Sequence, residues 1–227
     1  MNYPDFEEII TPARIGRYLA ACGGSTRKAM TLYRKNIKLS QELFTVISCF
    51  EIALRNTIDK HYTLTLGNDW LQNAASSNGI FDNNKCRLTQ SNINEAIRNL
   101  NHSYTHFKLI AELGFGFWRY LFANNQFIAA GSTLLQILPA KPRSTPSIQY
   151  NHNYILNQLA VINDLRNRIA HHEPICFVPG QPVKNTMYSR NHHNLILQLF
   201  QWMHIDSGKL LFGLDHTLDV CDEIDNL

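Results

Sequence analysis

Apolar residues recur every three or four positions along this chain, and this spacing restricts its fold more than any other feature of the sequence. The segment 41–66 is the clearest case, with apolar positions that fall on one face of a helix: Leu43, Ile47, Phe50, Leu54 and Ile58. Ser40 suits the N-cap of this helix, and Gly67 suits its end. No segment alternates apolar and polar residues as a half-buried β-strand does. The sequence therefore predicts an all-α fold, a helical bundle with additional N- and C-terminal helices.

Start and stop signals divide the rest of the chain into shorter helices. We expect them at about 12–22, 25–36, 89–102, 147–172 and 186–204, followed by one or two short helices in the tail. The polar segment 68–84 is predicted to be a loop, and the prolines near 139–146 mark the main break. With 227 residues, of which 44% are hydrophobic, the chain can bury a sizeable core, so we expect a single domain over residues 1–227.

Composition limits the classes of partner and the cellular compartment. The formal net charge of +3, without any block of like charges, permits nucleic-acid contact but does not by itself indicate it. The five cysteines are scattered and lack CxxC spacing, which argues against a disulfide framework and favours a reducing compartment. The first residues do not resemble a signal peptide, and no apolar run approaches the roughly 20 residues of a membrane span. We therefore expect a cytoplasmic protein without a membrane partner.

The segment 161–174 carries the groups best suited to chemistry. Its apolar spacing predicts the end of a long helix, which Pro174 cannot continue. Asn167 and His171 are four residues apart and share one face, and Arg166 lies one position round from it. A guanidinium can hold a phosphate with two hydrogen bonds, and an imidazole can move a proton near neutral pH. These side chains therefore indicate a site for a phosphate ester.

The pattern Arg-polar-x3-His formed by these residues resembles the signature of the HEPN superfamily, which includes many ribonucleases. The longer string 165–174, LRNRIAHHEP, looks like the Abi-like proteins, a bacterial abortive-infection branch of that superfamily. Further segments are similar to the same family: 11–19, 32–36, 50–56 and 112–122. The resemblance implies a HEPN-like helical bundle and a metal-independent ribonuclease that needs no cofactor. In such an enzyme the RNA 2′-hydroxyl attacks the adjacent phosphate and leaves a 2′,3′-cyclic phosphate.

The resemblance also assigns roles to individual residues. His171 would take or give the proton, Arg166 would stabilise the charge of the phosphorane, and Asn167 would hold the imidazole or a phosphate oxygen. The adjacent His172 is a supporting candidate, although its side chain should point about 100° away from that of His171. HEPN proteins commonly dimerise, so we expect a homodimer with a composite site. The expected partners are RNA and an antitoxin or regulatory protein, in abortive infection against phage or as a toxin.

A second group of residues is predicted to support the site. Glu51 and Arg55 have the spacing of a helical ion pair, which is either purely structural or orients Arg166 or His171. Asn56 completes this group, and with Arg55 and His61 it forms a looser version of the same signature.

Other interpretations stay open at this point. Arg166 could pair with an acidic neighbour such as Glu51 or Asp164, while His171 caps the helix. The chain could also be a non-catalytic HEPN-like helical module that binds RNA or a nucleotide or regulates a partner, or an all-α interaction protein with a buried polar network. The aromatic residues of 112–122 are expected to fill the core, although they could also form a platform for RNA bases. A metal site is not expected, because the spacing of the candidate ligands matches no zinc pattern: His192, His193, His204 and Cys221.

Overall fold

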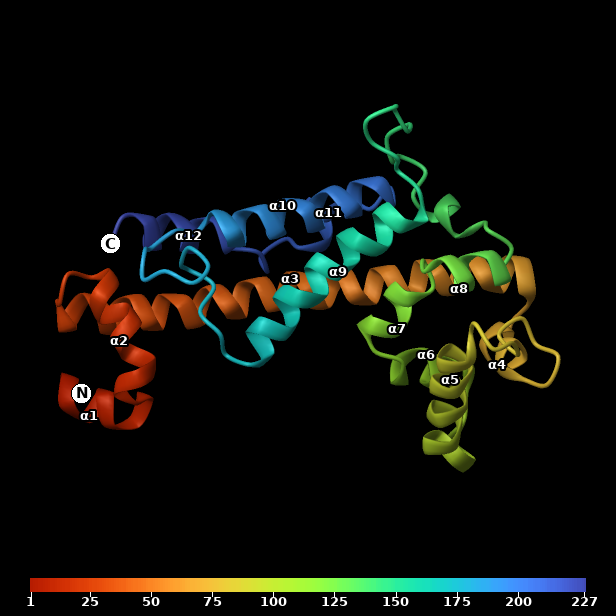
Figure 1. Cartoon of the computed structure of the whole chain (residues 1–227), viewed down its shortest axis with the longest axis horizontal. Helices are drawn as coiled ribbons and strands as arrows, with labels where there is room; N and C mark the ends of the chain where they lie inside the picture. Colours follow the sequence, from red (N-terminus) through yellow and green to blue (C-terminus); the bar gives the residue numbers. More distant parts are fainter. The chain divides into compact units, whose positions relative to one another are not determined.

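The computed structural model describes residues 1–227, and its regular structure is helical (Figure 1). The α-helices are α1 (Tyr3–Ile10), α2 (Pro12–Ala21), α3 (Thr26–Leu66), α4 (Trp70–Ala75), α5 (Arg87–Leu100), α6 (His106–Glu112), α7 (Phe115–Tyr120), α8 (Asn124–Ala129), α9 (His152–Ala170), α10 (Met187–Trp202), α11 (Ser207–Leu210) and α12 (Thr217–Asp225). Two short 3₁₀ helices are η1 (Asn101–Ser103) and η2 (Leu134–Ile137). Strand pairing is limited to one isolated bridge between Phe177 and Lys184. The predicted all-α class is therefore confirmed.

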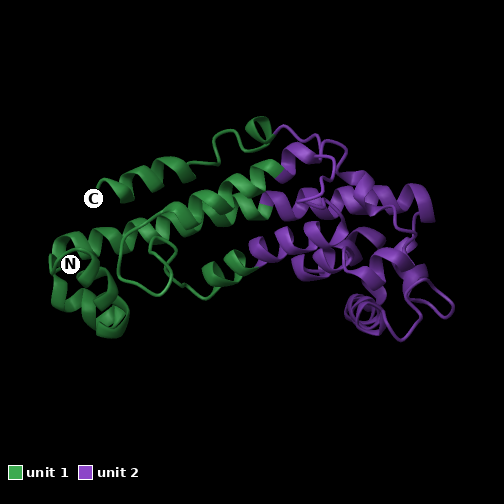
Figure 2. Cartoon of the chain, turned by 45° about the horizontal axis from the view of Figure 1, so that its top comes forward, with its two compact units in different colours: residues 1–48, 164–198, 207–227 green, residues 49–163, 199–206 purple.

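The residues fall into two compact units, which Figure 2 shows in different colours. The first unit contains residues 1–48, 164–198 and 207–227, and the second contains 49–163 and 199–206. Their boundaries lie inside α3, α9 and α10, so each of these helices belongs to both units. The proline-containing break near 139–146 lies within the second unit and is not a boundary. The single domain over 1–227 stays a prediction.

The expected helices at 25–36 and 41–66 are one continuous helix, α3, so the prediction of a break before Ser40 was wrong. Figure 1 shows α3 as an unbroken helix. Residues 37–40 contain neither glycine nor proline, and the buried face continues through them with Leu32, Leu39 and Leu43. Serine is common at an N-cap but is also tolerated inside a helix, so its presence alone did not identify a helix start.

Two further predictions need correction. The helix α9 begins at His152 rather than near 147, because the Asn151 side chain accepts a hydrogen bond from the backbone N–H of Tyr154 at 3.0 Å and caps the helix there. The segment expected to be a loop contains α4, whose Trp70 is buried and donates its indole N–H to Asp59 at 2.8 Å. The short helix α1 was not expected from the sequence.

The core of the first unit supports the end of α9 and the chain that follows it. Buried apolar side chains come from every helix of this unit except α11: Phe6, Ile15, Tyr18, Leu32, Leu39, Leu43, Leu165, Ile175, Phe177, Ile196 and Ile224. The Tyr18 ring lies edge-on to the Phe177 ring, with centroids 5.0 Å apart. The Arg17 guanidinium stacks over the same Phe177 ring, 4.6 Å from its centroid. The segment after α9 is therefore packed against α2.

Candidate functional site at the end of α9

The helix α9 ends in a closed hydrogen-bonded turn. The backbone N–H of His172 donates to the carbonyl of Ile169 at 2.9 Å, and that of Glu173 donates to the carbonyl of Arg168 at 2.8 Å. His172 has φ +55°, in the left-handed region. This is the Schellman arrangement, in which the left-handed position is usually glycine. The helix therefore ends before Pro174, through its own terminal turn.

Side chains from three other helices hold the backbone that leaves this turn. The Arg14 guanidinium on α2 donates to the carbonyl oxygen of His172. The buried Asn36 side chain on α3 accepts a hydrogen bond from the N–H of Ile175 at 2.9 Å. The buried Ser189 hydroxyl on α10 donates to the carbonyl of the same Ile175 at 2.9 Å. The backbone next to His171 is thus fixed by residues that the sequence analysis did not select. No local pattern marks them, because they are distant in the chain.

Arg168 is also used by the protein itself. Its guanidinium donates to the Glu173 carboxylate at 3.1 Å and to the Pro174 carbonyl at 2.8 Å, and it stacks 4.6 Å from the centroid of the Tyr188 ring. The neighbouring His192 is buried, and burial together with the charge of Arg168 lowers its pKa. This arginine therefore holds the turn after α9 against α10.

In contrast, Arg166, Asn167 and His171 have no side-chain hydrogen bond and no ion pair within the chain. Arg166 and Asn167 are half-buried, and His171 is exposed. The alternative in which Arg166 pairs with Asp164 and His171 caps the helix carbonyls is therefore not what the structure contains. Arg166 and Asn167 lie near the end of α9 and His171 directly follows it, and the polar groups of all three are available to a ligand.

A groove of about 320 Å³ lies beside this helix end, within the first unit. We call it the α3–α9 groove. Its walls come from α3 and from the end of α9: Ile37, Ser40, Gln41, Phe44, Ile169, Ala170 and His172. The only predicted site residue among these is His172.

The sequence of the chain agrees with a known family over most of this architecture. Residues 5–176 match the family model described as Abi-like protein. The chain belongs to the Abi-like protein family. This membership suggests a role in abortive infection, that is, in defence against phage. No curated protein and no solved structure matches the chain significantly. The matched residues include α9 and its terminal turn but not α10–α12.

The supporting candidates other than His172 lie in the second unit of this Abi-like protein, on the part of α3 after Cys49. Glu51 and Arg55 do not form the ion pair that their spacing indicates, and the Arg55 Nε is buried without a hydrogen-bond partner. Asn56 is exposed. Their supporting role stays a prediction.

The looser signature that ends at His61 is built differently. The His61 Nε2 shares a hydrogen bond with the hydroxyl of Thr133 at 2.9 Å, and burial lowers the pKa of its ring. His61 lies inside α3 rather than at a helix end. This histidine is therefore part of the packing of the second unit.

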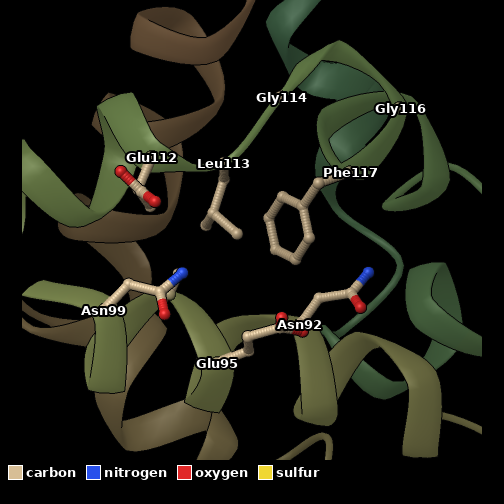
Figure 3. Close-up of a pocket in the computed structure, with 9 residues that line it drawn as sticks. Asn92, Glu95, Asn99, Glu112, Leu113, Gly114, Gly116 and Phe117 are labelled. Carbon is tan, nitrogen blue, oxygen red and sulfur yellow. The ribbon is translucent and has the colours of Figure 1, made fainter.

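A second pocket, of about 360 Å³, lies in the second unit between α5 and the α6–α7 segment. Figure 3 shows the Leu113 and Phe117 side chains pointing into it, with Asn92 and Asn99 on the α5 side. Its polar lining also includes two carboxylates, Glu95 and Glu112. Negative charges repel phosphate, so this pocket does not suit the backbone of a nucleic acid.

The remaining candidate groups contribute to structure. Trp118 and Phe122 are fully buried, and the Trp118 indole donates to the Leu113 carbonyl at 2.8 Å, so the core-filling interpretation is confirmed for both. His193 hydrogen-bonds Asp215 at 2.6 Å. Although burial raises the pKa of Asp215, the hydrogen bonds from His193 and Thr217 outweigh it and lower the pKa to about 2. The structure contains no cluster of three or more His, Cys, Asp or Glu side chains placed to hold a metal ion.

None of the helices has both the length and the apolar character needed to cross a bilayer.

Proposed function

We propose that this Abi-like protein is a metal-independent endoribonuclease of the HEPN type, which acts in abortive infection. The observation that carries the proposal is the contrast at the end of α9 between a backbone fixed by Arg14, Asn36 and Ser189 and side chains that have no partner. A group that serves only folding gains nothing from such freedom. A catalytic group needs both a fixed position and free polar atoms.

The proposed reaction uses one nucleophile from the RNA and no group from outside the protein and substrate. The 2′-oxygen attacks the adjacent phosphorus, the bond from phosphorus to the 5′-oxygen breaks, and the 2′-proton passes to a base while the 5′-oxygen receives a proton. The products are a 2′,3′-cyclic phosphate and a free 5′-hydroxyl. His171 moves the proton, and Arg166 donates to the non-bridging oxygens as their charge increases. Asn167 shares a helix face with His171 and orients its ring or a phosphate oxygen.

One copy of the chain supplies one such imidazole, whereas the reaction needs a base that accepts the 2′-proton and an acid that donates a proton to the 5′-oxygen. Two copies of the chain would supply two. We therefore include in the proposal a homodimer with a composite site, in which a symmetric pair of α9 ends faces one phosphate. An antitoxin or other regulatory protein that covers these ends is the partner that a self-toxic activity requires.

The test is incubation of the full chain with mixed RNA in EDTA, followed by analysis of the new RNA ends. We compare the wild type with His171→Ala and with a matched control, His102→Ala, which removes an exposed histidine of η1. Cyclic-phosphate ends are expected from the wild type and the control but not from His171→Ala. Cleavage that persists in purified, folded His171→Ala contradicts the assignment. Sedimentation of the wild type at the same concentration tests the dimer separately.

A further inference from the structure

We propose that the α3–α9 groove binds one nucleobase of the RNA, beside the phosphate that is cut, and thereby gives the enzyme a base preference. This inference rests on the proposed function and deepens it. It concerns residues that neither the family match nor the signature assigns to binding.

The groove is a built feature of two helices. Ile37, Ser40, Gln41 and Phe44 follow the spacing i, i+3, i+4 and i+7, so they form one face of α3. The opposite wall is the last turn of α9 and the residue in left-handed conformation that follows it. A volume of about 320 Å³ is at the lower end of the range for small-ligand pockets and suits one base.

The lining of the groove is mostly apolar and also carries the polar side chains of Gln41 and Ser40, so it can take the face of a base. The Phe44 side chain is 43% exposed and Ile37 is 41% exposed, which leaves apolar surface for the face of an aromatic ligand. The carboxamide of Gln41 and the hydroxyl of Ser40 have no hydrogen-bond partner in the chain. They can pair with the donors and acceptors on the edge of a base.

The position of the groove connects it to the proposed site. Ala170, which lines the groove, is four residues after Arg166 and lies on the same face of α9. His172, which also lines it, directly follows His171. The exposed Arg14 guanidinium contacts the His172 carbonyl and supplies a positive charge at the same end of the helix. A nucleotide whose base enters the groove therefore has its phosphates among these cationic groups.

This geometry requires an RNA whose base is free to leave its neighbours, so the substrate is single-stranded. The Phe44 ring provides stacking that every base can use. Gln41, with one donor group and one acceptor group, distinguishes between base edges. The expected consequence is a preference at one position next to the cleaved bond.

Binding is tested with the full chain in EDTA, with the four 5′-mononucleotides and with ribose 5-phosphate as the probe that lacks a base. We expect at least one nucleotide to bind more tightly than ribose 5-phosphate. Stacking contributes about 1–3 kcal/mol per base, so Phe44→Ala should weaken that binding about five- to 150-fold. Phe212→Ala is the matched control, because Phe212 is 87% exposed in the first unit and does not line the groove. Equal binding of ribose 5-phosphate, or full binding by Phe44→Ala, overturns the proposal.

A second measurement separates this proposal from the proposed function. In His171→Ala, the tighter binding of a nucleotide relative to ribose 5-phosphate should persist even if this variant cleaves no RNA, because both probes carry the same phosphate. In cleaved RNA, sequencing of the new ends should show a base preference for the wild type that Gln41→Ala weakens. Cleavage without any preference, and without an effect of Phe44→Ala on nucleotide binding, leaves the nuclease but overturns the groove assignment. Loss of a dimer in Phe44→Ala with unchanged nucleotide binding overturns it as well, because the groove is then a contact between copies.

Discussion

Arg55, Asn56 and His61 on α3 form nearly the same sequence pattern as Arg166, Asn167 and His171 on α9, and the two regions can be compared directly. In the first, the histidine shares a hydrogen bond with Thr133, while the Arg55 Nε is buried without a hydrogen-bond partner. In the second, the three side chains have no partner in the chain. The difference follows from position, because one pattern lies inside a long helix and the other at a helix end.

A helix terminus can combine a fixed backbone with side chains that have no partner. The last carbonyls and the following turn offer backbone groups for remote side chains, which Arg14, Asn36 and Ser189 use. Inside α3 the backbone groups are already paired with one another, so neighbouring elements can attach only through side chains such as His61.

The largest expected difference is in cleavage. His171→Ala should reduce the rate by about 10²–10⁴-fold, the usual contribution of general acid–base catalysis. His61→Ala should leave the cleavage rate per folded molecule unchanged, because His61 is a packing residue. Initial rates on one RNA, normalised to the folded fraction from circular dichroism, measure both. An equal loss in the two variants would remove the distinction between the regions.

The next difference is between the two arginines. Arg166→Lys should lower cleavage about a hundredfold, since a lysine cannot offer two parallel hydrogen bonds to a phosphate. Arg55→Lys should lower it far less. The thermal unfolding midpoint of Arg166→Lys should stay close to that of the wild type, because Arg166 makes no hydrogen bond or ion pair within the chain. If Arg166→Lys unfolds markedly earlier, Arg166 has a structural role after all.

The anchoring of the α9 terminus can be tested by removing one anchoring side chain and measuring the loss of stability. Asn36→Ala leaves the buried N–H of Ile175 without a partner and should lower the free energy of unfolding by about 1–3 kcal/mol. Asn191→Ala, an exposed site on α10, is the control. Denaturant titration gives the energies, and hydrogen exchange at Ile175 shows whether the loss is local. Equal stability of the two variants would mean that this hydrogen bond does not hold the turn.

Two helix ends share the left-handed histidine, which provides a matched pair. His172 has φ +55° after α9, and His204 has φ +57° after α10 with the same pair of terminal hydrogen bonds. Glycine adopts this conformation without strain, so His172→Gly and His204→Gly should each raise the free energy of unfolding by about 0.5–1 kcal/mol. Thermal melts of both proteins measure the gain. A loss of stability in either one shows that its imidazole contributes packing that outweighs the strain.

The smallest expected effect concerns pH. Burial lowers the pKa of His61 in the folded protein, so the unfolded chain binds a proton first as the pH falls through the ordinary histidine range. The contribution of His61 to stability is therefore present above that range and is lost as the pH decreases. His61→Gln should show a shallower decrease of the unfolding free energy between about pH 7 and pH 5. An identical pH profile would show that the ring is not buried in its neutral form.

Much of the fold could be predicted from local pattern. The apolar spacing gave the helical class, and the spacing of Asn167 and His171 placed both on one face of α9. Ser40 misled the prediction of α3, because a serine is compatible with a cap and with a helix interior. The ion pair expected between Glu51 and Arg55 does not form, and such a pair would stabilise a helix by only about 0.2–0.5 kcal/mol.

The surroundings of the candidate site could not be predicted in this way. The hydrogen bond from Arg14 to His172 joins residues 158 positions apart, and that from Asn36 to Ile175 joins residues 139 positions apart. No periodicity or motif in a single sequence specifies which distant side chain meets which carbonyl. The α3–α9 groove was missed for the same reason, because Phe44 and Ile169 become neighbours only in the folded chain.

The wide separation of these anchoring residues has a consequence for synthesis of the protein. Arg14 and Asn36 emerge from the ribosome early, whereas Ser189 emerges after His171. A nascent chain, or a fragment from a message that breaks before the codon for Ser189, lacks one of the three side chains that hold the end of α9. Under the proposed function, the messages being translated in the cell are therefore exposed to a fully assembled cleavage site only after synthesis has passed Ser189.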